Sequence, residues 1–252
     1  MMESSVAFLA RQILLWGEEN QEILTRSTLL VAGVGGVGCT AAEVLSRCGV
    51  GKLILIDNKE VDPPDLGRQS LYTIQDLGRP KAVAAAERLS KISGLTEILP
   101  LEETIGEMDL SAVLGECDGV LDCLDNFEAR FALEAELPGN SFIVHSAILG
   151  GFGQVTTTLP ERTVRLRDLY AGLNQPCSPV PVAAPIVYIL GSIMAQEALN
   201  NLWGKPELAG ELLVVDANHF FFSRETIKRP LTPGGQPSSS RSQRRSQAAT
   251  SL

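Results

Sequence analysis

The sequence predicts an α/β fold built on a doubly wound, Rossmann-like, mostly parallel sheet with additional C-terminal strands. One observation is that apolar runs alternate with helical patterns from residue 28 to residue 159. The other is the stretch 27–57, where an apolar run enters Gly33-Val34-Gly35-Gly36-Val37-Gly38 and a second run ends on Asp57, 19 positions after Gly38. This order of strand, glycines, helix, strand and acid predicts a nucleotide at the glycine loop.

The first third of the chain supplies the elements around this stretch. Residues 5–25 show helical spacing, with Phe8, Ile13 and Leu14 on one side and Arg11 interrupting. The ordinary interpretation of Arg11 is a solvated charge on that helix. Strands are expected at 28–32 and 53–56, a proline- and glycine-containing loop at 58–78, and a helix at 81–92 behind Pro80.

The rest of the chain continues the alternation and then departs from it. We expect strands at 96–101, 119–123, 142–145 and 154–159, with helices at 110–116 and 127–137. Residues 160–181 show no convincing period, and a segment of that length is usually a functional loop. A long apolar helix at 184–203 and two strands at 211–215 and 220–227 follow.

Composition limits the classes of partner. The chain has 252 residues, 44% of them apolar and 20% charged, with a formal net charge of −9. Because the segment after residue 230 carries three Arg and no acid, the body is more acidic still, and nucleic acid is not expected as a partner. We expect one domain over 1–229 and a disordered, Ser- and Gln-rich tail over 230–252.

The five cysteines indicate a reducing, cytoplasmic location rather than a disulfide framework. They are odd in number and scattered, at Cys39, Cys48, Cys117, Cys123 and Cys177. No Cys-x-x-Cys pair occurs, so no structural zinc is expected. The N-terminus does not resemble a signal peptide. The uncharged stretch 177–196 is broken by three prolines, so a buried helix is expected there and no membrane span.

Charged residues follow the ends of the expected strands. Arg68 and Lys81 come after the second strand and its Asp57, and Asp125-Asn126 follows a later strand. In open parallel sheets ligands bind outside the carboxyl ends of strands, so two cations and two carboxylates meet at one edge. Nucleotidyl transfer needs such a set, with Asp125 available for Mg²⁺. The simpler alternatives are that Asp125 caps the next helix and that Arg68 and Lys81 are surface charges.

Taken together, these motifs resemble the ThiF/HesA/MoeB family, relatives of the ubiquitin-activating enzymes. The resemblance extends from about Phe8 to Arg229 with matching order and spacing. It is carried by Arg11-Gln12, Gly33-x-Gly-Gly-x-Gly38, Leu55-Ile56-Asp57, Asp65-Leu-Gly-Arg68-Gln69, Gly78-x-Pro-Lys81 and Leu121-Asp-Cys-Leu-Asp125-Asn126.

The resemblance implies ATP-dependent adenylation of a ubiquitin-like sulfur-carrier protein ending in Gly-Gly. The carrier's C-terminal carboxylate would attack the α-phosphorus, giving an acyl-adenylate and pyrophosphate. Asp57 would bind the ribose, Arg68 and Lys81 the phosphates, and Asp125 with Asn126 the Mg²⁺ and phosphates, while Arg11 would reach the partner's ATP in a homodimer. The implied nucleotide-binding set is Gly33, Gly35, Gly36, Gly38, Asp57, Asp65, Arg68, Lys81, Asp125 and Asn126, and the catalytic set is Arg11, Arg68, Lys81, Asp125 and Cys177.

The chain departs from the family pattern in two places. Family members usually carry Asn where this chain has Asp65, and the added negative charge is expected to weaken ATP binding unless Mg²⁺ or Arg68 offsets it. Many members hold zinc with two Cys-x-x-Cys pairs, both absent here, so the loop around 161–166 must be held by packing or substrate and is expected to be mobile.

The cysteines and His145 have simpler interpretations beside any reactive one. Cys177 resembles a thiol that links covalently to the carrier in some members, and a passive loop cysteine is the equal alternative. The other four cysteines are expected to be packing residues. His145 ends a strand near the expected cleft and is interpreted as structural.

Other functions stay open at this point. The glycine fingerprint allows an NAD-linked oxidoreductase, although His145 and His219 are the only histidines available as acid or base. The departures at Asp65 and at the zinc pairs allow a non-catalytic nucleotide-binding scaffold subunit. Dehydration of tRNA through adenylation is disfavoured by the acidic body. The carrier's pathway, whether thiamine, molybdenum cofactor or another branch of sulfur metabolism, is not specified.

Overall fold

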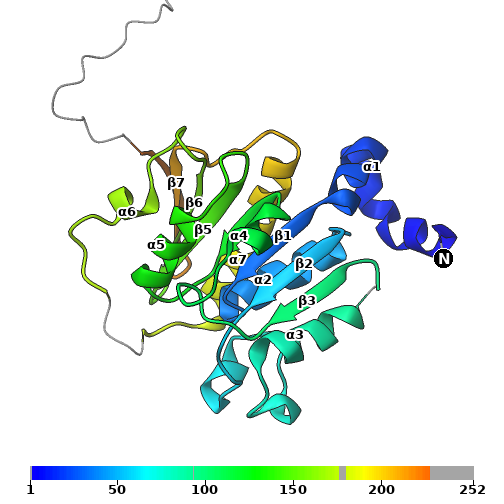
Figure 1. Ribbon diagram of the computed structural model, residues 1–252, viewed down its shortest axis with the longest axis horizontal. Coiled ribbons are helices and arrows are strands. Elements are labelled where there is room, and N and C mark those ends of the chain that lie inside the picture. The colour runs from blue at the N-terminus through cyan, green and yellow to red at the C-terminus, as the bar shows by residue number, and fades with distance from the viewer. Residues whose placement is uncertain (1, 93, 176–179, 228–252) are drawn as a thin grey trace, which may run out of the picture.

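A computed structural model describes residues 2–92, 94–175 and 180–227, with side chains from residue 7. Its strands form one eight-stranded sheet in the order β3-β2-β1-β4-β5-β6-β7-β8 (Figure 1). The strands are β1 (Thr28–Ala32), β2 (Lys52–Ile56), β3 (Glu97–Leu101), β4 (Gly119–Asp122), β5 (Phe142–Leu149), β6 (Phe152–Thr158), β7 (Glu211–Asp216) and β8 (Phe221–Thr226). The pairings among β1 to β5 are parallel, and those of β5-β6, β6-β7 and β7-β8 are antiparallel.

Helices cover both faces of the sheet. They are α1 (Met2–Arg26), α2 (Gly36–Arg47), α3 (Lys81–Ser90), α4 (Ser111–Gly115), α5 (Phe127–Ala135), α6 (Leu166–Leu169) and α7 (Ala184–Leu202), with two short 3₁₀ turns at Pro63–Gly67 and Ile74–Asp76. Leu29 and Val31 of β1 join the core under α2, α3 and α7, whereas Leu30 and Ala32 join the core under α4, α5 and α6. Successive strand residues thus point into opposite layers, as in a doubly wound sheet.

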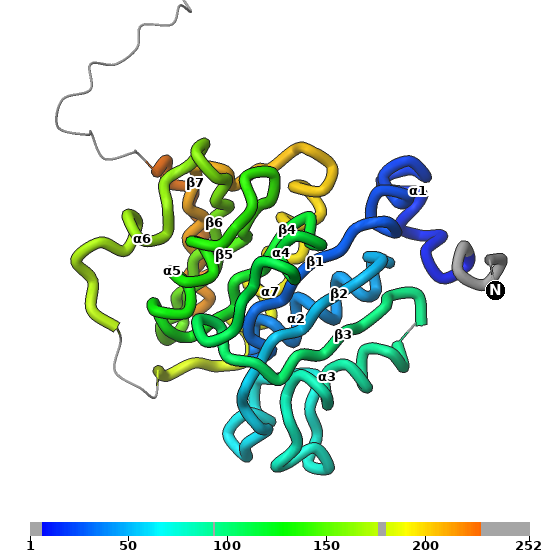
Figure 2. Tube along the Cα trace, viewed as in Figure 1, coloured from blue at the N-terminus to red at the C-terminus, as the bar shows by residue number. Residues whose placement is uncertain are grey.

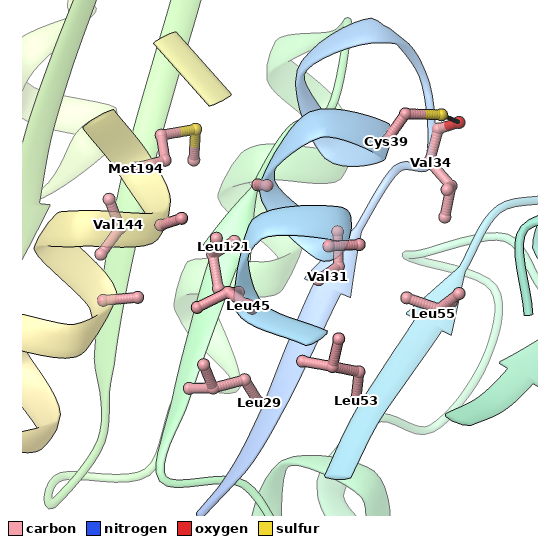
Figure 3. Packing of buried hydrophobic residues seen from close by; sticks show 14 of the residues in the cluster. Leu29, Val31, Val34, Cys39, Leu45, Leu53, Leu55, Leu121, Val144 and Met194 are labelled. Atoms are coloured by element: carbon pink, nitrogen blue, oxygen red, sulfur yellow. Dashed lines mark hydrogen bonds between the residues drawn. The ribbon is translucent and has the colours of Figure 1, made fainter. Parts of the chain in front are cut away.

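The core beneath α2 sets the position of the glycine loop. Leu45 of α2 lies against Leu29, Val31 and Leu121 of the strands, all fully buried (Figure 3). At the loop end of the helix, the Cys39 thiol donates a hydrogen bond to the Val34 carbonyl oxygen at 3.3 Å. The helix start and the loop before it are therefore fixed to the sheet by close packing.

The strand order reverses between β1 and β4. Val31 of β1 pairs with Leu55 of β2 on one side and with Leu121 of β4 on the other. The connections leaving β1 and β4 run to opposite faces, with α2 on one and α5 on the other. A crevice at the carboxyl ends of the strands is expected at this switch point.

Helix α7 anchors the antiparallel half of the sheet. It packs against α2, β5 and β6, and its Glu197 is only 2% exposed. The Glu197 carboxylate accepts hydrogen bonds from the Thr157 hydroxyl and the Leu208 amide, both at 2.8 Å. Among the described residues, none of the helices is long and apolar enough to cross a membrane.

Helix α1 bends at Gly17, whose φ is +83°. Trp16, directly before the bend, has its ring 5.5 Å from the ring of Trp203, the residue that follows α7, and the first part of α1 extends from the side of the sheet (Figure 2). Leu9 is buried, but Leu14 and Leu15 are 84% and 81% exposed. The expected apolar side of this helix is therefore wrong at Leu14.

The fold class is confirmed, and most elements lie where the pattern predicts them. Two differ. β5 continues past residue 145 to Leu149 because β6 pairs with it along its whole length, from Ile143↔Thr158 to Leu149↔Phe152. The region 160–175 contains the short helix α6, which the sequence pattern did not indicate. Residues 176–179 and the tail expected over 230–252 lie outside the described residues.

Candidate functional site

A cavity of about 1230 Å³ opens at the carboxyl ends of β1, β2 and β4. Nine of the ten residues expected to bind the nucleotide line it: Gly33, Gly35, Gly36, Asp57, Asp65, Arg68, Lys81, Asp125 and Asn126. Gly38 is the exception. The cavity continues past Arg130 and Tyr170 to apolar residues of the antiparallel sheet, including Phe152 and Val214.

The glycines of the loop serve packing as well as ligand access. Gly33 has φ +87°, and a Cβ there would lie 2.9 Å from the carbonyl oxygen of Cys123 at the end of β4. A Cβ on Gly38 would lie 2.0 Å from the Gly33 oxygen, so Gly38 closes the turn instead of facing the cavity. Helix α2 begins at Gly36 with no side-chain cap, which leaves its first amides available to an anion.

Asp57 joins the end of β2 to the glycine loop. Its Oδ2 accepts a hydrogen bond from the Val34 amide at 2.8 Å, and its Oδ1 accepts one from the Lys59 amide at 2.9 Å. The side chain is half-buried and lines the cavity. Each carboxylate oxygen retains a second lone pair, so two ribose hydroxyls can still donate to Asp57.

Asp65 is buried against the two cations expected on the phosphates. Its Oδ2 lies 2.8 Å from the Lys81 Nζ, and its Oδ1 lies 3.3 Å from the Arg68 Nη2. The Gln69 amide donates to the same Oδ1 at 2.6 Å, and the Asp62 N–H donates to Oδ2 at 3.0 Å. Burial alone would raise the pKa of Asp65, but Lys81, the Asp62 amide and Arg68 lower it below its usual value.

The charge added by Asp65 is therefore offset inside the protein. Lys81 contributes most of the positive charge that offsets Asp65. Arg68, the cation anticipated from the sequence, contributes less. The consequence is that both cations are already partnered before any phosphate arrives, and they are held in place by a buried carboxylate.

Asp125 is an exposed carboxylate that lines the cavity. Its side chain is 70% exposed, and its Oδ2 lies 2.6 Å from the Nζ of Lys59. The cap of α5 is Asn126, whose Oδ1 accepts the Ala129 amide at 2.8 Å. The capping role considered for Asp125 thus belongs to its neighbour, and Asp125 is left facing the cavity.

Lys59 is a site residue that the sequence pattern missed. Burial alone would lower the pKa of Lys59, but the hydrogen bond to Asp125 and the charges of Asp125 and Asp57 raise it. Lys59 lies in the loop between an expected strand and an expected helix, so no periodic pattern in the sequence indicated a role in the site. Only the meeting of the β2 and β4 ends brings it to Asp125.

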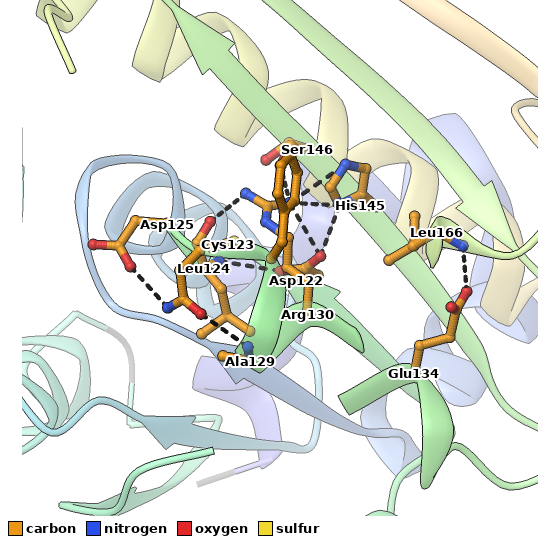
Figure 4. A network of polar contacts seen from close by, with 12 residues as sticks. Asp122, Cys123, Leu124, Asp125, Ala129, Arg130, Glu134, His145, Ser146 and Leu166 are labelled. Atoms are coloured by element: carbon orange, nitrogen blue, oxygen red, sulfur yellow. Dashed lines mark hydrogen bonds and ion pairs between the residues drawn. The ribbon is translucent and has the colours of Figure 1, made fainter. Parts of the chain in front are cut away.

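A buried polar network lies under the cavity (Figure 4). The His145 Nδ1 lies 2.7 Å from the Asp122 Oδ2, and its Nε2 lies 2.6 Å from the Tyr170 hydroxyl. Arg130 donates to the Asp122 carboxylate at 3.2 Å and to the Ser146 carbonyl at 2.7 Å. His145 and Asp122 are fully buried, which agrees with a structural role for His145.

Charge in this network is balanced. Burial, followed by the Arg130 charge, lowers the pKa of His145, so the ring is neutral at pH 7. The Nδ1 of this ring faces both the Asp122 carboxylate and the Arg130 Nη1, which lies 2.6 Å away, while its Nε2 faces the Tyr170 hydroxyl, to which Gln154 also donates. Tyr170 lies just after α6, so the network ties the loop region to β4 and β5.

The region 160–175 is held by contacts with α5 and with the core beneath it. The half-buried Glu134 of α5 accepts hydrogen bonds from the Leu166 amide at 2.6 Å and the Arg167 amide at 3.4 Å, at the start of α6. Leu166 and Tyr170 are buried in the core under that face of the sheet. These contacts meet the expectation that packing holds this segment, and its mobility stays a prediction.

The remaining expected site residues lie elsewhere. Arg11 is exposed on α1 and does not line the cavity. Cys177 lies outside the described residues. The other four cysteines match their expected packing role, and burial raises the pKa of Cys39 and Cys117 to about 12. His219 is 77% exposed on the β7-β8 turn.

The charge around the cavity bears on Mg²⁺. Within the described part of the chain, six carboxylates and four cations line the cavity, so its net charge is negative. A triphosphate with four negative charges and no bound metal ion would be repelled by this charge. No group of three or more His, Cys, Asp or Glu is placed to hold a metal among those residues. Mg²⁺ is commonly held by one or two carboxylates plus substrate phosphates, and the exposed Asp125 fits that use.

Comparison of the sequence with known proteins gives consistent matches. The profile of the ThiF family matches residues 9–233. The molybdopterin-synthase adenylyltransferase of Escherichia coli is 34% identical over 216 residues, covering 82% of this chain and 86% of that protein. The E. coli sulfur carrier protein ThiS adenylyltransferase is 32% identical, with 82% and 85% covered. The sulfur carrier protein adenylyltransferase of Thermus thermophilus is 34% identical, with 88% and 87% covered.

Solved structures share the fold at lower sequence identity. The microcin C7 biosynthetic enzyme MccB, in complex with N-formylated MccA, aligns with a TM-score of 0.77 at 16% identity, covering 90% of this chain and 74% of that one. The crystal structure of PaaA aligns with a TM-score of 0.76 at 19% identity, covering 89% and 83%. These likenesses concern the arrangement of the elements.

The buried ion pair of Asp65 with Lys81 predicts a stability effect. Asp65→Asn leaves the ammonium group, 7% exposed, facing a neutral amide, and the free energy of unfolding should fall by about 3 kcal/mol. Because the pKa of Asp65 is lowered from 3.8, this stabilisation is present at neutral pH and is lost as the pH falls below that value. Urea unfolding at pH 7 and pH 3 measures both effects.

Glu22→Gln is the matched control, because it breaks the Arg26–Glu22 ion pair, whose side chains are 79% and 67% exposed. We expect a change below about 1 kcal/mol there. Equal losses in the free energy of unfolding for the two substitutions at pH 7 would contradict the prediction that the buried Asp65–Lys81 pair stabilises the fold.

Proposed function

The chain belongs to the ThiF family, and on that basis we propose that it adenylates the C-terminal glycine carboxylate of a ubiquitin-like sulfur-carrier protein. The observation that carries the proposal is the meeting of the glycine loop, Asp57, the pair Arg68 and Lys81, and Asp125 in one cavity. The named activities of relatives at 32% to 34% identity support the same reaction. The enzyme is a nucleotidyltransferase of the ubiquitin-activating type, and the cysteine pattern suits a cytoplasmic location.

The cavity has a polar arrangement that suits ATP. Asp57 accepts the ribose hydroxyls, and the free amides at the start of α2 face the phosphates. Arg68 and Lys81 supply positive charge at the triphosphate, with Asp65 fixing their positions. Asp125 would hold Mg²⁺, which would supply neutralisation of phosphate charge.

The reaction needs positioning more than a base. A carrier carboxylate oxygen forms a bond to the α-phosphorus, the bond from that phosphorus to the bridging oxygen breaks, and its electron pair leaves with pyrophosphate. The nucleophile is already ionised at pH 7, so no side chain has to remove a proton. Arg68 and Lys81 therefore act by stabilising charge on the oxygens around the phosphorus and on the leaving group.

The cavity also has room for the end of the carrier. Beyond Arg130 its walls become apolar, with Leu149 and Phe152 on the β5-β6 hairpin and Val214 on β7. An extended Gly-Gly tail has no side chains to exclude it from such a channel. We place the tail there, with its carboxylate directed toward the glycine loop.

The active form is proposed to be a homodimer. Arg11, Leu14 and Leu15 are spaced i, i+3 and i+4 on α1, so they share one face of the helix, and the two leucines are more than 80% exposed. Two adjacent exposed leucines are unfavourable in water unless another surface covers them. A second copy covering this face would carry Arg11 toward its partner's ATP.

Two alternative functions were left open by the sequence, and the geometry weakens the first of them. An NAD-linked oxidoreductase needs an accessible acid or base, but His145 is fully buried and His219 does not line the cavity. A scaffold subunit would bind ATP without chemistry, and the exchange measurement below separates it from an enzyme. The role of Cys177 as a thiol that accepts the carrier after adenylation stays a prediction from the sequence.

Asp125→Ala is predicted to abolish adenylation. Loss of the metal carboxylate should lower carrier-dependent exchange of radiolabelled pyrophosphate into ATP by at least about 100-fold. Asp109→Ala, in an exposed loop acid that accepts the Ser111 amide, is the matched control and should keep the wild-type rate. Retained exchange in Asp125→Ala would mean that the metal carboxylate is misplaced.

The homodimer predicts a second result. Leu14→Asp with Leu15→Asp should convert the protein from dimer to monomer in light scattering coupled to size-exclusion chromatography, because four charges would enter the interface. Ile74→Asp, at an apolar side chain that is 75% exposed on a 3₁₀ turn, should remain dimeric. A dimeric double variant, or a monomeric wild type, would contradict the assignment of this face.

A further inference from the structure

Lys59 bridges two strand ends at the mouth of the cavity. It follows β2, whereas Asp125 follows β4, and β1 with its glycine loop lies between these strands. The ion pair at 2.6 Å therefore spans the loop on which the phosphates are expected to rest. Both side chains line the cavity and are more than half exposed, so a ligand can reach them.

The backbone of Lys59 is fixed on both sides. Its N–H donates to Asp57 Oδ1 at 2.9 Å, and its carbonyl oxygen accepts the Lys81 N–H at 2.9 Å. The residue is thus held between the carboxylate assigned to the ribose and the start of α3. Because the backbone of Lys59 is fixed, its ammonium group is restricted to a small region of the cavity. A lysine on a mobile loop would lose more conformational entropy on binding the same phosphate.

The exposed ion pair is weak enough to be exchanged. Pairs between solvent-exposed side chains are worth about 0–1 kcal/mol, so Asp125 holds the ammonium group without trapping it. Asp125 is the carboxylate that would hold Mg²⁺, and with that carboxylate engaged the Lys59 ammonium group would be free to take another partner. For the displaced Lys59 ammonium group, the nearest new partner is the phosphate that is joined directly to the ribose. This follows because Lys59 is hydrogen-bonded to Asp57, the carboxylate assigned to the ribose hydroxyls.

We propose that Lys59 is the cation that binds the α-phosphate of the nucleotide, held ready by Asp125 until Mg²⁺ replaces it there. This inference rests on the proposed function, since it assumes that Asp57 binds the ribose and Asp125 the metal. It adds a residue that contacts the reacting phosphorus group, in a pocket whose other phosphate cations, Arg68 and Lys81, are paired with the buried Asp65.

The test is a binding series with adenosine, AMP and ATP, measured by calorimetry with Mg²⁺ present. Lys59→Met keeps the length of the side chain and removes its charge. It should bind AMP and ATP at least about tenfold more weakly than the wild type, while its affinity for adenosine is unchanged. Lys59→Arg, which keeps a charged donor, should restore most of the AMP affinity.

Lys52→Met is the matched control. It removes the same charge from the other end of β2, where Lys52 lies 3.3 Å from Glu116, and all three affinities should match the wild type.

Three results would overturn the proposal while leaving the adenylation function in place. They are wild-type AMP affinity in Lys59→Met, loss of ATP affinity alone, which would assign Lys59 to the distal phosphates, and equal loss for adenosine, which would indicate a structural role. A wild-type protein that binds none of the three nucleotide ligands would overturn this inference together with the proposed function.

Discussion

The candidate site depends on how closely β1 approaches β4 at the point where the strand order reverses. Ala32 pairs with Asp122, and Gly33 then turns with its α-carbon against the carbonyl of Cys123. Any larger residue at position 33 would push the glycine loop away from β4, and with it the start of α2. This close approach keeps the first amides of α2, where we propose that the phosphates bind, beside the loop that carries Asp125.

Charge pairing organises the site before a ligand binds. Buried Asp65 orients Lys81 and Arg68, while the exposed Asp125 holds Lys59 loosely. The difference in burial gives the two carboxylates different uses. Asp65 fixes its two cations because burial and the surrounding hydrogen bonds hold the pair together, whereas we propose that Asp125 exchanges its exposed cation for Mg²⁺. Below them, Asp122, Arg130 and neutral His145 form a closed network that ties the loop region 160–175 to the sheet.

Much of the fold followed from short-range pattern. The strand at 28–32, the glycine turn and the helix behind it are dictated by apolar spacing and backbone freedom, which a single stretch of sequence records. The meeting of Asp57, Arg68, Lys81 and Asp125 could also be predicted, because parallel strands end at a common edge. The length of β5 could not, since it is set by its antiparallel partner β6. Lys59 and the network around Asp122 depend on contacts between distant loops and strands, which no local period reveals.

The site and the relatives together assign to this chain the transfer of an adenylyl group to a carrier carboxylate. The most direct measurement is intact-protein mass spectrometry of a purified ubiquitin-like carrier ending in Gly-Gly, after incubation with this protein, ATP and Mg²⁺. We expect a carrier heavier by one adenylyl group at its C-terminal glycine, and no gain in mass for a carrier that lacks the terminal glycine. An unmodified carrier, in a mixture where the protein binds ATP, would contradict it and favour a nucleotide-binding scaffold.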